Sequence, residues 1–316
     1  MVPATIRYSR LVESRLTVEL RDLEYFAVVA EHGNVRRASE ALDLSPPALS
    51  KSLRRLEQSM RAKLVERTPK GVDLTPVGLA LLTHVQRLRL TLQDVHREAE
   101  DLSLGRAGHV RIGVGATTVE DLPGSCAALL QQAPGLTAQI TVGDNDEMLP
   151  ALGHGDLDLI FNVLPDAPYP GCLQERLFDD LFVVCAAADH PLARRRRIPL
   201  AELAREDWTL SVPSVMNVQH IRRVFEANGL PMPRIAVEAR PLRLRLQICA
   251  STRLLSFVVR RALRLVAPGL RLKELAVDEL KWRRPVGVIY RNQSYLSPAA
   301  QQLIRLLRTL KSDAGR

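Results

Sequence analysis

The most constraining feature of this sequence is a heptad repeat that runs from position 81 to position 102. Its apolar residues alternate between spacings of four and three, so they return to one narrow face of a helix. Thr75 and Pro76 are suited to begin this helix, and Gly105 and Gly108 to end it. The repeat consists of Leu81, Val85, Leu88, Leu92, Val95, Ala99 and Leu102. It predicts a long helix over 77–104 that dimerises as a coiled coil, and packing of this face on its own domain is the alternative.

The charge of the chain favours a polyanionic partner. Among the 316 residues, 44 are Lys or Arg and 35 are Asp or Glu, which gives a net charge of +9. A solvated arginine-rich surface would give the same balance, so charge alone does not decide the matter. No apolar run is long enough to cross a membrane, and the first residues lack the apolar core of a signal peptide. We expect a cytoplasmic protein with no membrane partner and a loose N-terminal extension over 1–19.

Residues 20–76 show short helical patterns that are separated by tight turns. A helix from about 20 to 31 is followed by Gly33, which favours a helix end, and Asn34 can cap a second helix over 35–42. After a very short turn, Ser45 can cap a third helix whose first turn holds two prolines. Two helices joined in this way, the second of them basic and exposed, form a helix-turn-helix.

The third helix is expected to have an apolar face and a basic face. Its core positions are Leu49, Leu53, Leu56 and Met60, and the basic and hydrogen-bonding residues lie on the other side. Seven basic and two acidic residues between 45 and 70 give a local net charge of +5. The candidate DNA contacts in the helices are Arg36, Ser45, Pro47, Ser50, Lys51, Arg54 and Arg55. A basic surface helix without a partner is the alternative.

A β-hairpin wing is predicted directly after the basic helix. Two short strand-like segments flank a turn at Pro69, Lys70 and Gly71. Arg67, Thr68 and Lys70 would lie near its tip, where they suit contact with phosphates or with the minor groove. A plain surface hairpin is the alternative, but the adjacent basic helix favours contact with DNA.

The run from residue 20 to residue 82 resembles the winged helix-turn-helix of LysR-type transcriptional regulators. The matching segments are LRDLEYFAVVAEHGNVRRASEALDLSPPALSKSLRRLEQ and LVERTPKGVDLTPVGLALL. The family usually has Gln after the serine that begins the recognition helix, whereas this sequence has Pro46, which carries no side-chain hydrogen bond. Base reading is therefore expected to shift toward Ser50, Lys51 and Arg54. The resemblance implies that 20–76 is the DNA-binding domain and 77–104 the linker helix for dimerisation.

Residues 105–316 read as an α/β domain in which short apolar strands alternate with helices. Strands are expected at 109–114, 137–142, 155–161 and from 181, with helices from about 119 and over about 144–153. GDLDLIF and HPLA, at 155–161 and 190–193, match the effector-binding domain of LysR-type regulators. That resemblance implies two α/β subdomains, similar to periplasmic solute-binding proteins, which are joined by two crossover strands around a ligand cleft.

Five polar residues are candidates for this cleft. Thr117 and Thr118 follow the first strand, Asn162 follows the GDLDLI strand, and Ser211 and Ser214 follow the WTLSV strand. Ligands of open α/β sheets bind beyond the carboxyl ends of strands, and a helix start with hydroxyl groups suits an anion or a polar molecule. Ordinary cap and turn residues are the alternative reading for each of them.

The sequence predicts a ligand-responsive transcription factor without enzymatic activity. No metal-ligand spacing, phosphate-binding loop, nucleophile motif or dinucleotide fingerprint is present, so neither a metal nor a cofactor is expected. The expected partners are double-stranded promoter DNA, a small-molecule effector, a second copy in a homodimer or homotetramer, and RNA polymerase if the protein activates transcription. A small-molecule receptor without DNA binding is the main rival, and it leaves residues 20–104 unexplained.

Overall fold

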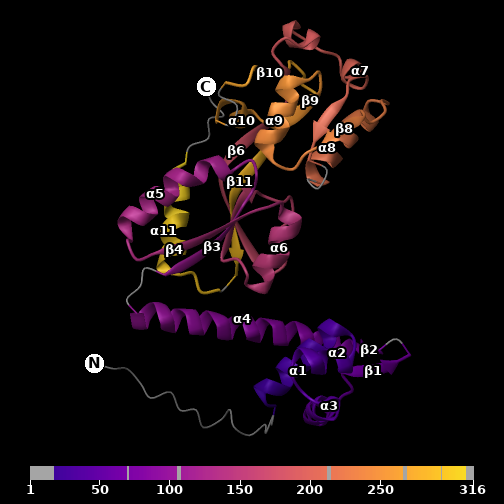
Figure 1. Ribbon diagram of the computed structural model, residues 1–316, viewed down its shortest axis with the longest axis vertical. Helices are drawn as coiled ribbons and strands as arrows, with labels where there is room; N and C mark the ends of the chain where they lie inside the picture. Colours follow the sequence, from indigo (N-terminus) through magenta and orange to yellow (C-terminus); the bar gives the residue numbers. More distant parts are fainter. Residues whose placement is uncertain are drawn as a thin grey trace. The chain divides into compact units, whose positions relative to one another are not determined.

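The computed structural model describes residues 18–310 except 70, 105–107, 212–214, 266–268 and 293. The expected extension over 1–19 lies almost entirely outside the described residues. The chain divides into two compact units, with the boundary between Val95 and His96 (Figure 1). Each unit is described by itself.

The first unit begins with three helices that match the expected helix-turn-helix. They are α1 (Leu20–His32), α2 (Val35–Ala41) and α3 (Pro46–Met60). The Asn34 side chain accepts hydrogen bonds from the backbone of Arg36 and Arg37, and the Ser45 hydroxyl accepts one from the backbone of Ala48, so both predicted caps are confirmed. The helices enclose a core of Phe26, Val29, Ala38, Leu49, Leu53, Leu56, Leu64 and Val85.

The predicted wing is an antiparallel hairpin of β1 (Val65–Thr68) and β2 (Gly71–Leu74). It packs closely on the turn after α1, because the backbone N–H of Val72 donates to the carbonyl of Gly33 at 2.8 Å. Gly71 has a φ of 143°, and a Cβ there would lie 2.2 Å from that same carbonyl oxygen. The wing can therefore contact the helices at this point only through a residue that has no side chain.

A buried carboxylate connects the first and third helices. Asp22 in α1 is 1% exposed and accepts hydrogen bonds from the Ser52 hydroxyl at 2.5 Å and from Nε of Arg55 at 2.7 Å. Burial favours the neutral carboxyl, but the hydrogen bonds from Arg55 and Ser52 outweigh this, so the pKa of Asp22 is lowered. This contact fixes α3 against α1 and thereby sets which face of α3 is exposed.

The long helix α4 (Pro76–Leu104) begins where the sequence indicated. The Thr75 hydroxyl accepts a hydrogen bond from the backbone of Gly78 at 3.0 Å and donates one to the carbonyl of Lys63 at 2.7 Å. The helix start is thus capped and tied to the segment before the wing.

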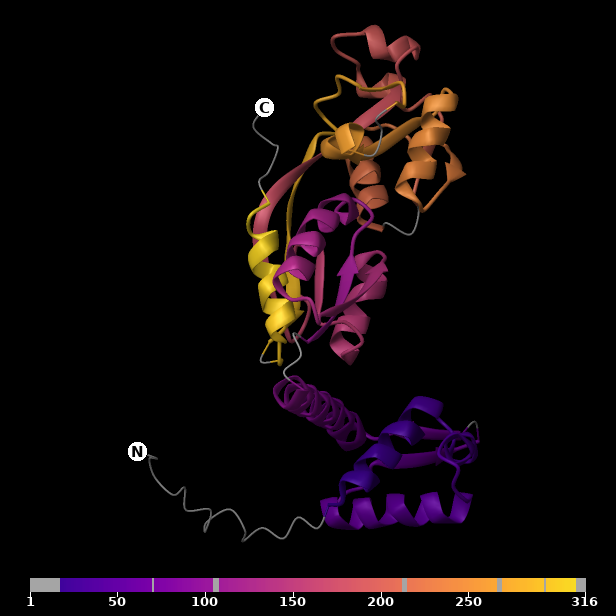
Figure 2. The same cartoon turned by 60° about the vertical axis from the view of Figure 1, so that its left-hand side comes forward.

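The second unit is built on one mixed sheet of nine strands in the order β4-β3-β5-β11-β6-β9-β7-β8, with β10 also paired to β6. The strands are β3 (His109–Val114), β4 (Thr137–Val142), β5 (Leu159–Val163), β6 (Cys172–Ala187), β7 (Trp208–Leu210), β8 (Ile235–Glu238), β9 (Leu255–Val259), β10 (Leu272–Glu274) and β11 (Trp282–Arg291). Strands β6 and β11 are long, run antiparallel, and pass from one subdomain into the other (Figure 2). The two crossover strands implied by the resemblance are confirmed.

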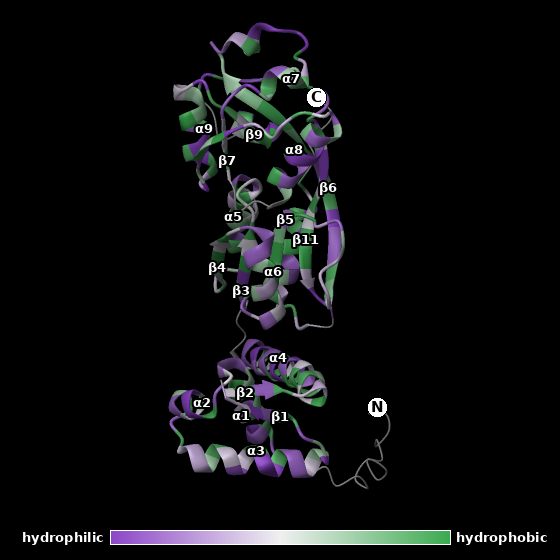
Figure 3. Ribbon diagram, turned by 90° about the vertical axis from the view of Figure 1, so that its right-hand side faces the viewer, coloured by the Kyte–Doolittle hydropathy of each residue, from purple (hydrophilic) through white to green (hydrophobic). Residues whose placement is uncertain are grey.

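Helices cover the sheet in both subdomains. The first subdomain contains η1 (Val119–Asp121), α5 (Leu122–Gln132), α6 (Asn145–His154) and α11 (Pro298–Leu307). The second contains η2 (Pro191–Arg194), α7 (Leu200–Leu203), α8 (Val215–Ala227), α9 (Leu242–Ser251) and α10 (Arg260–Leu265). The central strand β5 is mostly hydrophobic, whereas the first half of β6 mixes hydrophobic and hydrophilic residues (Figure 3).

Three expected boundaries in this unit differ from the structure. The strand expected over 155–161 is β5, which begins only at Leu159 and extends to Val163, because Gly155 still serves as the C-cap of α6. Asn162 therefore lies within the strand and does not follow it. The helix expected from about 119 is a 3₁₀ turn, η1, and the regular helix α5 begins at Leu122, just before Pro123. Strand β6 begins at Cys172, well before the expected position 181. Its first half was missed because the segment CLQERLFDD has neither a strict polar–apolar alternation nor a continuous apolar run. The pairing of this half with β11 makes it a strand.

Replacement of Asp22 by Asn should destabilise the first unit by about 2–3 kcal/mol at pH 7, because it removes a charged hydrogen-bond acceptor from a buried site. Because the pKa of Asp22 is lower in the folded state than its ordinary value of 3.8, the charged carboxylate stabilises the folded state at neutral pH. This contribution should be lost as the pH falls from 3.8 toward the lower pKa of the folded state. Thermal unfolding of both proteins between pH 3 and pH 7 would measure this. Equal stability of the two proteins at pH 7 would contradict the assigned role of Asp22.

Candidate functional site

The exposed face of α3 is basic, as the sequence indicated. Pro47, Lys51 and Arg54 are exposed and Ser50 is half-buried, whereas Leu49, Leu53 and Leu56 are buried in the core. No described residue forms an ion pair with Lys51 or Arg54, so both cations are available to an external anion. Ser45 lies at the start of the helix and serves as its cap.

Two basic residues near this face are held by the protein itself. Arg55 makes a two-pronged ion pair with Asp22 and a longer one with Glu19, and Lys63 pairs with Glu57 at 2.9 Å. The local charge of +5 in the sequence therefore overstates the free positive charge in the structure. Among the expected DNA contacts, Arg55 has a structural partner, and a contact from it to DNA stays a prediction.

The remaining expected DNA contacts lie on α2 and the wing. Arg36 is exposed on α2, with a weak surface ion pair to Glu40 at 3.3 Å. Arg67 is exposed on β1 and Thr68 is half-buried at the end of that strand. Lys70, which was expected near the wing tip, lies outside the described residues.

The heptad repeat of α4 is divided between two environments. Val85 is 5% exposed and Leu81 is partly buried, and both pack on the core of the first unit. The dimer role expected for these two residues is therefore wrong. Their own domain covers their side chains, so they do not form a free surface for a partner. The rest of the repeat, which consists of Leu88, Leu92, Val95, Ala99 and Leu102, is exposed.

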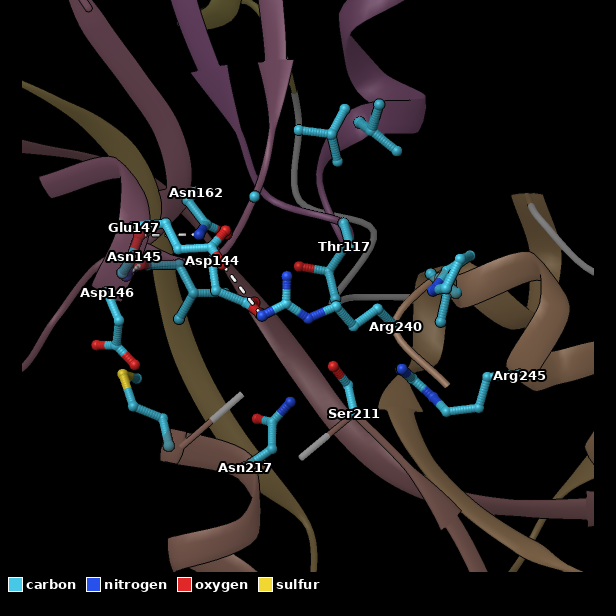
Figure 4. A pocket seen from close by; sticks show the side chains of 18 of the residues that line it. Thr117, Asp144, Asn145, Asp146, Glu147, Asn162, Ser211, Asn217, Arg240 and Arg245 are labelled. Carbon is cyan, nitrogen blue, oxygen red and sulfur yellow. Dashed lines mark hydrogen bonds and ion pairs between the residues drawn. The ribbon is translucent and has the colours of Figure 1, made fainter. Parts of the chain in front are cut away.

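The second unit contains a pocket of about 460 Å³ between its two subdomains. The segments that line it follow the ends of β3, β4, β5, β7 and β8, and Figure 4 shows their side chains converging from both sides. The carboxyl ends of parallel strands within each subdomain meet at one edge of its sheet, so these segments gather where the two edges face each other.

Three of the five expected pocket residues line this pocket. Thr117, Asn162 and Ser211 are part of its wall. Nδ2 of Asn162 donates to Oδ1 of Asn145 at 2.9 Å, and Nδ2 of Asn145 donates to the carbonyl of Val163 at 2.8 Å, so this side of the wall is held in place. Ser214 lies outside the described residues.

The expectation for Thr118 is wrong. Its side chain is 0% exposed, and its hydroxyl lies within hydrogen-bonding distance of two carbonyls, those of Gly115 at 3.1 Å and Phe161 at 2.9 Å. The hydroxyl thus stabilises the turn after β3 from within the protein, and it faces away from any ligand. Adjacent threonines on a tight turn point in different directions, and the sequence could not show which of them would face inward.

Several charged residues of the pocket were missed from the sequence. Asp144 and Glu147 follow β4, while Arg240 and Arg245 follow β8. Thr117 was predicted because ligands of open α/β sheets bind beyond the carboxyl ends of strands, and the same rule applies to the ends of β4 and β8. The signal was therefore present in GDNDE at 143–147 and in the arginine that follows VEA at 237–239.

The charges of the pocket are arranged by subdomain, with acids on the first and arginines on the second. Arg240 forms an ion pair with Glu147 at 3.1 Å across the pocket, as the dashed line in Figure 4 shows. Burial, followed by repulsion from Glu147, raises the pKa of Asp144. The acidic wall is thus partly neutralised by the protein itself.

An aromatic surface completes the pocket. Phe182 and Trp282 line it from the two crossover strands. Behind Trp282, the ring of His220 stacks in parallel with a centroid distance of 4.1 Å. Burial, with the nearby charges of Arg284 and Arg223, lowers the pKa of His220 to about 4, so this ring is neutral at pH 7. The aromatic wall therefore carries no titrating charge near neutral pH.

In the described part of the chain, no three His, Cys, Asp or Glu side chains come together as a possible metal site. Nor does any described helix have the length and apolar character needed to span a membrane.

Comparison with known proteins assigns both units to one family. Residues 20–79 match the family model for the bacterial regulatory helix-turn-helix protein of the lysR family, and residues 103–311 match the LysR substrate binding domain. The RuBisCO operon transcriptional regulator of Allochromatium vinosum is 30% identical over 283 residues, which cover 90% of this chain and 93% of that regulator.

Solved structures share the fold. Full-length CbnR complexed with its target DNA aligns with a TM-score of 0.50 and 24% identity, covering 92% of this chain and 98% of CbnR. The regulatory domain of Synechocystis PCC6803 CcmR in complex with 2-PG aligns with a TM-score of 0.59 and 20% identity, covering 65% of this chain and 98% of that domain.

This chain belongs to the LysR family of transcriptional regulators. It is a DNA-binding regulator with a winged helix-turn-helix domain, a linker helix and an effector-binding α/β domain. The rival interpretation, a receptor without DNA binding, does not fit the match over 20–79.

The two neighbouring threonines should respond differently to the same substitution. Thr118→Val removes a buried hydroxyl that bonds to a carbonyl, so it should destabilise the second unit by about 1–2 kcal/mol. Thr117→Val should change stability by less than about 0.5 kcal/mol, because its side chain faces the pocket. Urea unfolding of both variants would measure this difference. A larger loss from Thr117→Val would reverse the assignment of the two residues.

Proposed function

We propose that this regulator binds promoter DNA as a homo-oligomer and that the pocket between its two subdomains is the effector site. The observation that carries the first part is the capped helix α3, which keeps Lys51 and Arg54 free on its exposed face next to a wing. In a winged helix-turn-helix, that face enters the major groove and the wing reaches the adjacent backbone. The complex of CbnR with its target DNA supports this assignment by its related fold.

Base reading is assigned to the middle of α3. Arg54 has a planar fork that fits the O6 and N7 acceptors of guanine, and Lys51 and Ser50 precede it on the same side. Pro47 and the cap Ser45 lie at the start of the helix, and we assign them contacts with the DNA backbone. Arg36, Arg55, Arg67, Thr68 and Lys70 are proposed as phosphate contacts that position the domain without reading the sequence.

Two copies of α3 are required for a stable complex with a promoter. In a symmetric dimer, two recognition helices would enter successive major grooves about 34–36 Å apart, which predicts half-sites about one helical turn apart. The exposed part of the α4 repeat, from Leu88 to Leu102, is proposed as the seam between the two copies. Either a homodimer or a homotetramer could form around this seam.

Effector binding would act through the two subdomains of the second unit. A ligand that contacts both walls of the pocket stabilises one arrangement of the subdomains over another, which is a population shift. The ion pair between Arg240 and Glu147 joins the two walls of the pocket, so the free energy of this pair contributes to the balance between the two arrangements. The resulting change would alter promoter binding and, where the regulator activates, contact with RNA polymerase. We place the protein in the cytoplasm together with its promoter DNA, and assign it no enzymatic role.

The direct experiment is a mobility shift of DNA taken from upstream of the regulator's own gene. Purified full-length protein should retard this fragment at concentrations at which it leaves unrelated DNA of the same length free. Equal retardation of both fragments in moderate salt would reduce the assignment to non-specific binding.

Arg54→Ala should weaken promoter binding by about 1–3 kcal/mol and relax the preference at one base pair, because a two-pronged contact to guanine is lost. As a control, Arg67→Ala should weaken binding to all sequences alike and lower the slope of log affinity against log salt by about one. Fluorescence anisotropy with single-base variants of the promoter separates these effects. Unchanged promoter affinity in Arg54→Ala would remove α3 from the reading role.

Leu88→Asp should convert the oligomer to monomers and greatly reduce promoter binding, because it places a charge in an apolar seam. Leu88 is 39% exposed, so the first unit should stay folded. Leu79, which is 57% exposed on the same helix but off the repeat, offers the matched control Leu79→Asp. Analytical ultracentrifugation would show the assembly state of both variants. Dimers of Leu88→Asp with normal DNA affinity would place the dimer contact elsewhere.

A further inference from the structure

One wall of the pocket contains a buried arginine that lacks an ionic partner. Arg245 in α9 is 5% exposed and lines the pocket. Its Nη1 donates to the carbonyl of Ala239 at 3.2 Å, and its Nε is buried without an acceptor. No described residue forms an ion pair with it or accepts a hydrogen bond from Nη2. The Nε–Nη2 edge of the guanidinium is therefore unused by the described part of the protein.

Two other buried arginines of this unit have carboxylate partners. Arg261 is 8% exposed and pairs with Asp121 at 3.0 Å and Asp180 at 2.7 Å. Arg284 is 3% exposed and pairs with Asp166 at 2.7 Å. A third, Arg291, is 8% exposed, donates to the carbonyl of Leu152 at 3.1 Å and does not line the pocket. Arg245 therefore differs from Arg261 and Arg284, and it lies at a pocket.

Burial without a partner has a free-energy cost that the fold does not offset at this position. Desolvation lowers the pKa of Arg245, although Asp144 and two cysteines oppose this from a distance. An arginine stays protonated at neutral pH even when buried, so the cost is that of an unpaired cation. A ligand that brings a negative charge would remove this cost, and this would strengthen its binding.

The surroundings of Arg245 define the rest of the ligand. Figure 4 shows its guanidinium directed toward Ser211, with Thr117 across the pocket. The pocket lining also includes Trp282, which is partly exposed, and Phe182, which is 2% exposed and packs against Trp282. A ligand that fills this space therefore needs a charged end for Arg245 and an apolar body for the aromatic wall.

We propose that the pocket binds a small organic oxyanion, a carboxylate or a phosphate monoester, through Nη2 of Arg245. A charge-assisted N–H···O bond from Nη2 fits either group, and Ser211, which also lines the pocket, donates a second. The apolar part of the ligand lies on Trp282. This inference rests on the proposed effector role of the pocket, and it adds the chemical class of the ligand.

The test uses the full-length protein and four probes that differ in charge and body. Benzoate and phenyl phosphate carry the two oxyanions on an apolar ring, benzamide is the neutral counterpart of benzoate, and inorganic phosphate lacks the ring. Thermal shift at millimolar concentrations, followed by calorimetry, should show binding of benzoate or phenyl phosphate. Benzamide and inorganic phosphate should bind at least about tenfold more weakly, because each lacks one of the two required parts.

Three variants separate the guanidinium from charge in general. Arg245→Met should weaken binding of the organic anion by about 30-fold or more, since it removes a buried charge partner. It should not lower the melting temperature without ligand, because an apolar side chain replaces an unpaired buried cation. Arg245→Lys keeps the charge and loses the fork, and it tests the same contact should the methionine variant fail to fold. Arg253→Met, at an exposed arginine that follows the same helix and does not line the pocket, should change binding by less than about threefold.

The outcomes distinguish this inference from the proposed function. Equal binding of benzamide and benzoate, full binding by Arg245→Met and Arg245→Lys, or no shift with either organic anion would overturn the oxyanion class. Promoter retardation by the same proteins, measured without probe, tests the DNA-binding role separately. A neutral compound that binds and also alters promoter retardation would keep the pocket as the effector site while rejecting the oxyanion.

Discussion

The pairing of β6 with β11 is the constraint on which the second unit depends. The two strands pair antiparallel from Trp282 opposite Phe182 to Arg291 opposite Cys172, so both subdomains share one sheet. The pairing is close enough that a Cβ on Gly287 would lie 2.0 Å from the carbonyl oxygen of Glu175. A register shift at this glycine lets the strands bend where they pass between the subdomains. The position of every other strand, and hence of the pocket, follows from this pair.

Positive charge serves two purposes in the first unit, and the structure separates them. Arg55 and Lys63 are paired with Asp22 and Glu57, so they help to hold α3 and the segment after it in place. Lys51 and Arg54 have no such partners among the described residues and remain exposed. A side chain is held in position for contact with DNA when ion pairs fix the helix that carries it. The paired Arg55 and Lys63 therefore help to keep Lys51 and Arg54 in position.

The sequence predicted most of the fold because its signals are local. The caps Asn34, Ser45 and Thr75 and the apolar stripe of α3 each lie within one element, and the structure confirms them. The missed features depend on partners far along the chain. The first half of β6, which has no clear strand pattern, is a strand because of β11, and Thr118 is buried because a carbonyl 43 positions later accepts its hydroxyl. Arg245 belongs to the same class, since neither its burial nor its missing partner can be read from neighbouring residues.

The divided repeat of α4 fixes the angle between the proposed dimer seam and the core of the first unit. Val85 is part of that core, and Leu88, three residues later, already faces outward. Because the helix between them is continuous, each residue inserted there would turn the seam by about 100° relative to α3. An insertion of seven residues would nearly restore the angle, whereas one or two would not. The length of the helix therefore sets this angle, and the lengths that relatives can tolerate between these positions should differ by nearly whole helical turns, such as seven or eleven residues.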